Sequence, residues 1–248
     1  MEKNIELLNQ KFKEIKRMGW ILGDKHNTGS VGLLFESCLG KERENFEIPD
    51  FHGIEIKVKG RSKENNITLF NSAPDSYLME VYRLKEEYGY PDQDFQEFKV
   101  FNVQINAKHK TKIPSGYKMQ LYVNEALQIV ELIVYDKNNC LIDDKTSWTF
   151  ALLEEKLTRK LSYLAYIEAE SQYWQGNKYY RYNQITFYKL KGMNTFLKLL
   201  KQGKICISFQ VGIRKSGNRI GQKYDHGTAF VISKYHLSYL FDKINIPA

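Results

Sequence analysis

The side chains best suited to chemistry lie close together in the run Ile48-Pro49-Asp50-Phe51-His52-Gly53-Ile54-Glu55-Ile56-Lys57-Val58. If residues 54–58 form a strand, alternation places Glu55 and Lys57 on one face and the apolar residues on the other. Asp50 follows a proline and precedes a glycine, which favours a turn that folds it back beside Glu55. Two carboxylates can hold Mg²⁺ with a phosphate oxygen, and a lysine can orient the attacking water. The pattern therefore indicates metal-assisted phosphate chemistry, although a solvated strand face also alternates in this way.

A third carboxylate, Glu36, lies on a helix predicted just upstream. Thr28 or Ser30 can cap this helix and Gly40 can end it, and the apolar residues between them fall at helical spacing. Glu36 lies within the apolar stripe or on its border, where a lone carboxylate costs free energy unless it has a partner. The site of Asp50 and Glu55 would supply that partner. The alternative is an ordinary residue at the rim of the helix.

These motifs together resemble the PD-(D/E)XK nucleases. Within them, the chain resembles the branch that joins the mismatch-repair nicking enzyme MutH to the MvaI/BcnI restriction endonucleases, and most closely the MvaI type. The resemblance runs over nearly the whole length and includes Asn27-Thr28-Gly29, Phe35-Glu36, the Pro49–Lys57 motif, Leu69-Phe70, Ala169-Glu170-Ser171 and Asp225-His226-Gly227-Thr228-Ala229-Phe230.

The resemblance implies a type II restriction endonuclease that hydrolyses phosphodiester bonds of double-stranded DNA at a short specific sequence and leaves a 5′-phosphate. It implies Mg²⁺ as cofactor, with Mn²⁺ as a substitute, bound by Asp50, Glu55 and the carbonyl of Ile56. Lys57 and Glu36 complete the catalytic set. It further implies a monomer that nicks one strand at a time, and a cognate DNA methyltransferase in the host that is not a stable subunit.

The expected fold is mixed α and β, with a restriction-endonuclease-like core and two lobes that hold DNA in a cleft. Residues 1–150 are expected to form the catalytic lobe and residues 151–248 mainly the sequence-recognition lobe, with the final strand and helix returning to the core. Besides the helix that carries Glu36, helices are predicted near 3–18, 76–88, 149–159, 194–202 and 233–241, and strands near 53–59, 66–71, 98–107, 117–123, 127–135, 161–169, 178–190, 204–213 and 226–232.

The segment 211–227 holds side chains of the types that can read base edges. It joins two strand-like runs and contains Arg, Lys, Asn, Gln, Asp and His with three internal glycines. Arg or Lys suits guanine, Asn or Gln suits adenine, and Asp suits cytosine. The DNA-reading candidates are Gln210, Arg214, Lys215, Asn218, Arg219, Lys223, Tyr224, Asp225 and His226. A solvated hairpin tip would have a similar composition.

Three positions depart from the family pattern in this region. Gln210, Tyr224 and Val231 stand where the related enzymes carry Arg, His and Arg. Arg is the usual guanine reader, Gln suits adenine, and Val can only contact a thymine methyl or pack. The expected target is therefore CCNGG-like with at least one outer base pair changed.

Further DNA contacts are expected from Asn27 and Thr28, which precede the helix of Glu36, and from His52. A helix N-terminus favours phosphate binding through its amides and its dipole. His52 lies between the two carboxylates of the motif, and it also fits as a plain loop residue.

The composition is compatible with a nucleic-acid partner. The chain of 248 residues carries 37 basic and 29 acidic side chains, a net charge of +8, which favours a polyanion and salt-dependent binding. No apolar run is long enough for a membrane span and the N-terminus is charged, so a cytoplasmic location is expected. Cys38, Cys140 and Cys206 lack metal-ligand spacing and are expected to be reduced packing residues.

Two other functions stay open at this level. One is a MutH-like strand-nicking repair endonuclease that partner proteins recruit. The other is a non-cleaving DNA-binding module of the same fold, whose expected signature is a broken Asp-Glu-Lys triplet. The triplet is intact here, which favours cleavage.

Overall fold

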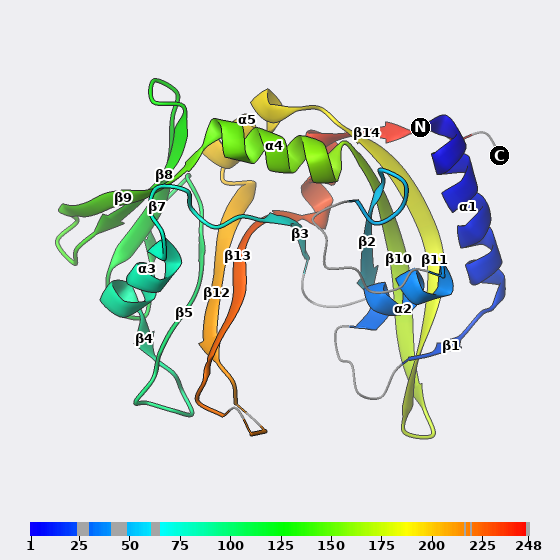
Figure 1. Cartoon of the computed structure of the whole chain (residues 1–248), viewed down its shortest axis with the longest axis horizontal. Coiled ribbons are helices and arrows are strands. Elements are labelled where there is room, and N and C mark those ends of the chain that lie inside the picture. The colour runs from blue at the N-terminus through cyan, green and yellow to red at the C-terminus, as the bar shows by residue number, and fades with distance from the viewer. Residues whose placement is uncertain (24–29, 41–48, 61–64, 216, 219, 247–248) are drawn as a thin grey trace. The chain divides into compact units, whose positions relative to one another are not determined.

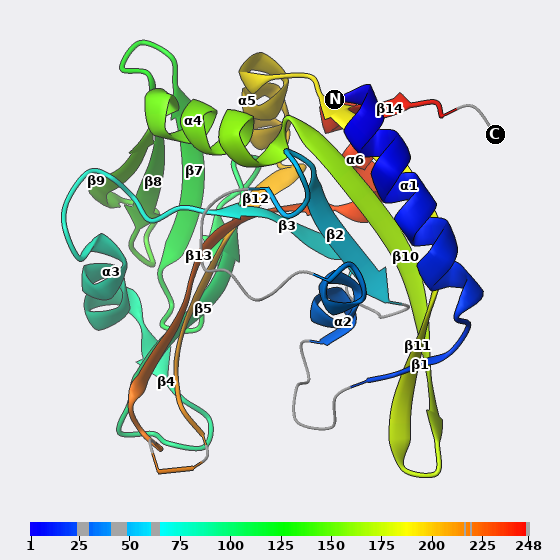
Figure 2. The ribbon, with the colours of Figure 1, turned by 45° about the vertical axis from the view of Figure 1, so that its right-hand side comes forward.

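The first helix forms because apolar residues recur at helical spacing. α1 (Glu2–Arg17) buries Ile5, Leu8, Phe12 and Ile15 on one face. Its polar face is left to solvent, as the sequence pattern predicts. The buried face packs on a sheet, and α1 lies along the hairpin of strands β10 (Tyr163–Trp174) and β11 (Asn177–Leu190) in both views (Figures 1 and 2).

The computed structural model describes residues 1–23, 30–40, 49–60, 65–215, 217–218 and 220–246. The chain divides into two compact units, each built from several segments. Unit 1 contains Met1–Ile67, Leu157–Lys191 and Leu237–Ala248, and unit 2 contains Thr68–Lys156 and Gly192–His236. A single boundary near residue 150, as expected from the sequence, does not describe this division, because pairing between strands joins segments that are distant in the chain.

Unit 1 is built on one mixed sheet. β10 and β11 form a long antiparallel hairpin, and β2 pairs parallel with β10. β1 and β14 each pair antiparallel with β11. The strands are β1 (Ile21–Leu22), β2 (Glu55–Gly60), β10 (Tyr163–Trp174), β11 (Asn177–Leu190) and β14 (Phe241–Ile244).

The core of unit 1 lies where α1 and α2 (Ser30–Cys38) meet this sheet. Phe35 of α2 is fully buried, and its ring packs edge-on against Tyr182 at a centroid distance of 5.0 Å. Ile54 and Ile56 enter the same core. The apolar side chains of the segment around β2 therefore face the core, and the opposite face of the strand is left for polar residues.

Unit 2 contains two sheets. The first has the order β3-β13-β12-β5-β4 and the second has the order β6-β7-β8-β9. Their strands are β3 (Asn66–Asn71), β4 (Tyr90–Pro91), β5 (Lys99–Ile105), β6 (Thr111–Lys112), β7 (Lys118–Asn124), β8 (Ile129–Tyr135), β9 (Leu141–Thr149), β12 (Ile205–Ile213) and β13 (Lys223–Ser233).

Aromatic side chains fill the core of unit 2. Phe230 of β13 contacts the rings of Phe70, Phe196 and Trp148 at centroid distances of 5.0, 5.7 and 5.9 Å. All four side chains are nearly inaccessible to solvent. Large rings of this kind bury much apolar surface and dominate core energetics. The remaining helical segments are α3 (Glu80–Tyr88), α4 (Phe150–Leu161), α5 (Met193–Lys201), η1 (Lys234–His236) and α6 (Leu237–Leu240).

The mixed α and β class predicted from the sequence is confirmed, with differences in detail. α3 begins at Glu80 rather than near residue 76, and β9 is a strand that the sequence pattern did not predict. In β9 the polar residues Asp143 and Thr146 are buried and the apolar residues Leu141 and Ile142 are exposed, so its apolar signal is weak. Within the described residues, no helix combines the length and apolar character needed to cross a membrane.

Candidate active site and base-reading hairpin

A two-residue turn brings Asp50 back to the strand that carries Glu55. Phe51 and Ile54 exchange backbone hydrogen bonds of 2.9 and 2.8 Å. Between them, His52 and Gly53 have φ values of 43° and 87°, the left-handed pair that a tight hairpin turn requires. The turn ends with Asp50 Oδ2 accepting a 2.9 Å hydrogen bond from the amide of Ile56. The predicted fold-back of Asp50 is thereby confirmed.

Alternation along β2 separates the charged and the apolar side chains. β2 pairs in parallel register with β10, so that Glu55 lies beside Leu164 and Lys57 beside Tyr166. Ile56, the residue between them, points into the core of unit 1. Glu55 and Lys57 therefore share the opposite face, as period-two alternation predicts.

Glu55 is a buried carboxylate that two lysines approach. Its residue is 1% exposed, and Lys57 Nζ donates to its Oε1 at 2.6 Å. Lys160 Nζ, from the last turn of α4, lies 3.6 Å from the same oxygen. Glu55 Oε2 is buried and has no hydrogen-bond partner among the described residues. A buried carboxylate oxygen in this state costs free energy, which a cation would offset.

The helix of Glu36 packs against β2. Tyr182 anchors the start of this helix, because its hydroxyl donates a 2.8 Å hydrogen bond to the carbonyl of Val31. Burial raises the pKa of Tyr182 well above its ordinary value, so this hydroxyl keeps its proton. Glu36 itself is half-buried and adjoins the buried Phe35. The structure thus brings the helix of Glu36 to the strand of Glu55 and Lys57.

The donor set fits a hard divalent cation. Asp50 and Glu55 supply carboxylates, and the carbonyl of Ile56 belongs to the residue whose amide holds Asp50. Oxygen donors with a few waters are the usual environment of Mg²⁺ in proteins. Among the described residues, no group of three or more His, Cys, Asp or Glu is arranged to hold a metal. A metal here would therefore depend on two carboxylates, a carbonyl and water.

In unit 2, an irregular register marks the hairpin of β12 and β13. Phe209 faces Thr228 and Val211 faces Asp225, so the single residue Gln210 lies opposite two residues of β13. Gly227, one of those two, has φ +92°, and its amide donates a 2.7 Å hydrogen bond to Asp225 Oδ1. Bulges of this kind bend a strand and redirect its side chains. Here the bulge lies beside two base-reading candidates, Gln210 and Asp225, both of which are exposed.

The basic residues of this hairpin differ in their surroundings. The guanidinium of Arg214 stacks over the ring of Tyr224 at 4.3 Å. Lys215 Nζ lies 3.0 Å from Asp92 Oδ1 and 2.7 Å from Asp94 Oδ2. Hydrogen bonds to Asp94 and Asp92 raise the pKa of Lys215. Lys215 must therefore exchange these carboxylates for phosphate if it is to contact DNA.

The structure describes only some of the other residues that were predicted to contact DNA. Asn218 is exposed. His52 is exposed in the turn before β2, and its carbonyl accepts a 3.0 Å hydrogen bond from Asn4 Nδ2. Lys223 and His226 are described only in their backbone, on β13. Asn27, Thr28 and Arg219 lie outside the described residues.

Lys160 is the site residue that the sequence does not reveal. It lies just beyond the predicted end of its helix and belongs to no local motif. Only the parallel pairing of β2 with β10, the strand that follows α4, brings it to Glu55. Nothing in a single sequence shows which helix will meet which strand, so no local signal identifies Lys160.

A mixed sheet that presents Asp50, Glu55 and Lys57 at one site, beside a helix that carries a further carboxylate, defines a nuclease with a PD-(D/E)XK-like fold. Comparison with known proteins identifies the family to which this nuclease belongs. Residues 9–241 match the model of the MvaI/BcnI restriction endonuclease family, and the chain belongs to that family.

Two solved structures resemble the chain over nearly all of its length. Restriction endonuclease MvaI in complex with its cognate DNA substrate is 29% identical, with 98% of each chain covered and a TM-score of 0.91. MvaI in the absence of DNA is 29% identical over the same shares, with a TM-score of 0.62. No curated protein sequence matches the chain. The chain is thus a type II restriction endonuclease, a site-specific deoxyribonuclease of a family that generally uses a divalent metal ion.

Proposed function

We propose that the chain hydrolyses both strands of duplex DNA at a short specific sequence with Mg²⁺ as cofactor, and that Asp50, Glu55, Lys57 and Glu36 form the catalytic set. The buried Glu55, paired with Lys57 and lying on the strand to which Asp50 folds back, is the observation that supports this proposal most directly. Two carboxylates and a lysine at one point suit phosphodiester hydrolysis.

The roles follow from the chemistry of each group. Asp50, Glu55 and the carbonyl of Ile56 would hold the Mg²⁺ ion. When bound, Mg²⁺ neutralises charge on the scissile phosphate and lowers the pKa of a coordinated water. Lys57 Nζ has three N–H donors and uses one on Glu55, so the others can orient the attacking water or stabilise the developing charge. Glu36 supports the cluster from α2.

The proposed reaction is the simple hydrolysis of a phosphodiester bond. The oxygen of water attacks phosphorus, the bond from phosphorus to the 3′-oxygen breaks, and the 3′-oxygen takes a proton. The products are a 5′-phosphate and a 3′-hydroxyl. A monomer with one such site cuts one strand at a time. Mn²⁺ serves as a substitute metal, and a separate host DNA methyltransferase protects the same sequence.

Sequence reading is assigned to the hairpin of β12 and β13 in unit 2. The carboxylate of Asp225 suits cytosine, and the amide of Gln210, at the bulge, suits adenine. Supporting contacts come from Arg214, Lys215, Asn218, Arg219, Lys223, Tyr224 and His226, with Asn27, Thr28 and His52 contributing from unit 1. Because Gln210 and Val231 replace guanine-reading arginines of the family pattern, at least one outer pair of a CCNGG-like target is changed.

The test is digestion of unmethylated phage DNA with purified protein and Mg²⁺, followed by sequencing of the cut ends. We expect discrete fragments whose ends share one short sequence. Lys57→Ala should slow cutting by about 10²-fold or more and leave DNA binding measurable. Lys13→Ala, which removes one exposed lysine from α1, is the charge-matched control and should cut normally.

Two results would contradict the proposal. Intact DNA at every salt and metal condition, with binding retained, would point to a non-cleaving module. Cleavage of unaltered CCNGG sites with full fidelity would overturn the proposed change in the outer pair.

A further inference from the structure

Unit 2 exposes three consecutive large apolar side chains between β3 and α3. Tyr77, Leu78 and Met79 are 63%, 97% and 72% exposed. Single exposed apolar residues are ordinary, but a run of three is unfavourable in water unless the residues have a function. We refer to residues 77–79 as the apolar loop.

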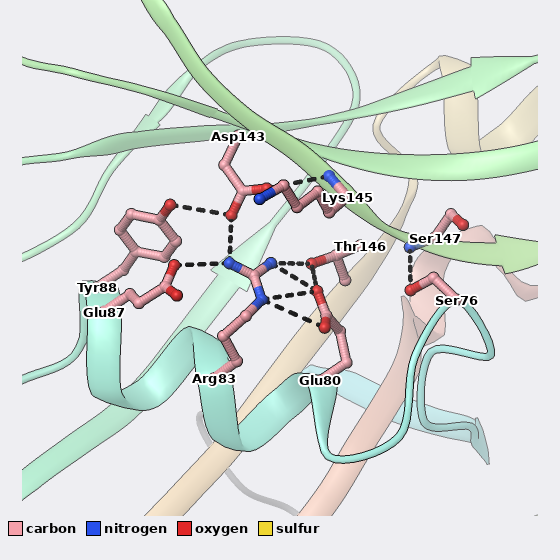
Figure 3. Close-up of polar contacts among 9 residues, drawn as sticks. All are labelled: Ser76, Glu80, Arg83, Glu87, Tyr88, Asp143, Lys145, Thr146 and Ser147. Carbon is pink, nitrogen blue, oxygen red and sulfur yellow. Dashed lines mark hydrogen bonds and ion pairs between the residues drawn. The ribbon is translucent and has the colours of Figure 1, made fainter.

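Hydrogen bonds to β9 hold the chain on both sides of the apolar loop (Figure 3). Before it, Asp75 accepts hydrogen bonds from the amide and the hydroxyl of Thr149 at 2.9 and 2.5 Å, and Ser76 accepts one from the amide of Ser147 at 3.1 Å. After it, Glu80 accepts a hydrogen bond from Thr146 at 2.5 Å. The loop is therefore tethered at each end to one strand.

An arginine completes the tether on the C-terminal side. Arg83 Nη2 contacts Glu80 Oε1 at 2.6 Å, and its Nη1 contacts Asp143 Oδ2 on β9 at 2.6 Å. Glu80 and Asp143 are both buried, so these contacts are shielded from solvent. Figure 3 shows the guanidinium between α3 and β9, with the carboxylates of Glu80, Glu87 and Asp143 around it.

Met79 adopts a backbone conformation that a methionine rarely takes. Its φ and ψ are 64° and 20°, in the left-handed region. This conformation is unfavourable for a non-glycine residue, and it persists only where the surroundings enforce it. The contacts of Glu80, directly after Met79, supply that enforcement. The backbone that carries the apolar side chains is thus held at both ends.

The apolar loop borders a hollow shared with the base-reading hairpin. This hollow has a volume of ≈ 350 Å³, and its lining includes all three residues of the apolar loop together with Val211 and Asp225 of the hairpin. Asp225 is a candidate cytosine reader and is exposed. A duplex that reaches the carboxylate of Asp225 therefore comes within reach of the loop.

We propose that the apolar loop is a DNA contact, in which Leu78 packs against the sugars or a base step next to the bases that the hairpin reads. This proposal rests on the proposed function of the hairpin. Apolar side chains are used in this way by proteins that press on a groove or wedge open a base step. A protein bound stably at the same hollow would cover Asp225 and compete with DNA, so the substrate is the occupant that agrees with cleavage.

The contact has a physical signature that distinguishes it from the basic residues. Lys and Arg contacts weaken with added salt because they displace counterions from phosphate. Leu78 carries no charge, so its loss should lower affinity at every salt concentration and leave the salt dependence unchanged. A loop tethered at both ends also loses less backbone entropy on binding than a free one.

The first experiment compares Leu78→Ser with Leu127→Ser. Leu127 is 64% exposed in the turn between β7 and β8 of the same unit, and it is the matched control. On a short duplex with the sequence found at the cut ends, Leu78→Ser should weaken binding by about tenfold with an unchanged salt slope. Its melting temperature should equal that of the control, and Leu78→Met should restore binding. Equal binding and cutting by Leu78→Ser and Leu127→Ser would overturn the proposal.

The second experiment identifies the occupant directly. A benzophenone amino acid at position 78, irradiated with the same duplex, should cross-link to DNA at one nucleotide position near the recognition sequence. Cross-linking to a second copy of the chain, or none in a sample that binds DNA, would overturn the proposal. Failure of the proposed function is recognised separately, because the wild-type protein would then leave the duplex uncut.

Discussion

Glu55 is a buried carboxylate whose two oxygens have different surroundings. Oε1 receives Lys57 at 2.6 Å and lies 3.6 Å from Lys160, whereas Oε2 has no hydrogen-bond partner among the described residues. The lysines neutralise the carboxylate before any cation binds. They also place positive charge where the proposed metal ion would bind, so they would oppose its binding while favouring the folded chain.

Replacing Lys160 by methionine should separate these two effects. The Mg²⁺ concentration for half-maximal cutting should fall by about three- to tenfold, because one repulsive charge is removed, which corresponds to roughly 0.6–1.4 kcal/mol. Measuring the cutting rate across a Mg²⁺ titration tests this. Lys160→Arg should behave like the wild type, and Lys13→Met is the control for a lost surface charge. An unchanged Mg²⁺ requirement in Lys160→Met would show that the 3.6 Å contact has no influence on the metal.

The contrast between Asp50 and Lys160 shows which residues of a site a sequence can predict. His52-Gly53 encodes a tight turn locally, so the return of Asp50 to the strand of Glu55 follows from neighbouring residues. Lys160 reaches Glu55 only through pairing between distant strands. Local patterns carry no information on that pairing, and Lys160 could therefore not be predicted.

At the scale of elements, the bulge between β12 and β13 controls how the hairpin presents its side chains. Gly227 at φ +92° places its amide 2.7 Å from Asp225 Oδ1, and this holds the carboxylate of Asp225, which pairs with Val211 next to Gln210. A residue with a Cβ is strained at this φ. The Asp-His-Gly sequence thus has a conformational reason for its glycine, in addition to any contact of its side chains with DNA.

Gly227→Ala should therefore impair reading more than stability. We expect a loss on the order of 1 kcal/mol in the free energy of unfolding from backbone strain, and a fall of about tenfold or more in kcat/KM as Asp225 and Gln210 move. Gly212→Ala is the matched control on β12, because its φ is not left-handed and an added Cβ meets nothing closer than 3.9 Å. Normal kcat/KM in Gly227→Ala would show that the bulge does not position the reading residues.

Strands with an ordinary apolar alternation were predicted close to their observed bounds, whereas β9 was not predicted at all. β5 and β7 alternate buried and exposed residues along their length. β9 instead carries Asp143 on its buried side, held by Arg83 and Tyr88. Polar residues that are buried in a network remove the hydrophobic signal on which strand prediction depends.

At the scale of the whole molecule, each unit has its own core, and each core joins segments from several parts of the chain. The residues expected to read DNA and those expected to cut it therefore belong to separate cores. The sequence-based expectation placed one approximate boundary near residue 150 and returned only the final strand and helix to the core. The observed division depends on which strands pair over long distances, and this is again information that local sequence lacks.

The network around Arg83 makes unit 2 sensitive to acid. Burial alone would raise the pKa of Asp143, but hydrogen bonds from Arg83, from the amide of Lys145 and from Tyr88 outweigh it and lower the pKa below its ordinary value. A carboxylate with a lowered pKa stabilises the fold above the pKa of the unfolded chain, about 3.9 for Asp. That contribution is lost as the pH falls through the lowered, folded-state value.

Asp143→Asn should therefore destabilise unit 2 at neutral pH and remove part of its acid sensitivity. We expect a loss on the order of 2–4 kcal/mol in the free energy of unfolding at pH 7, since a buried partner of Arg83 is removed. The difference from the wild type should shrink as the pH falls below about 4.

Unfolding of unit 2 can be followed by the fluorescence of Trp148, which is fully buried there and donates a 3.0 Å hydrogen bond to the carbonyl of Ser72. Trp20→Phe and Trp174→Phe isolate that signal, and Asp144→Asn, an exposed neighbour, is the control. If the free energy of unfolding changes with pH in the same way in the wild type and in Asp143→Asn, then Asp143 is not the acid-sensitive group.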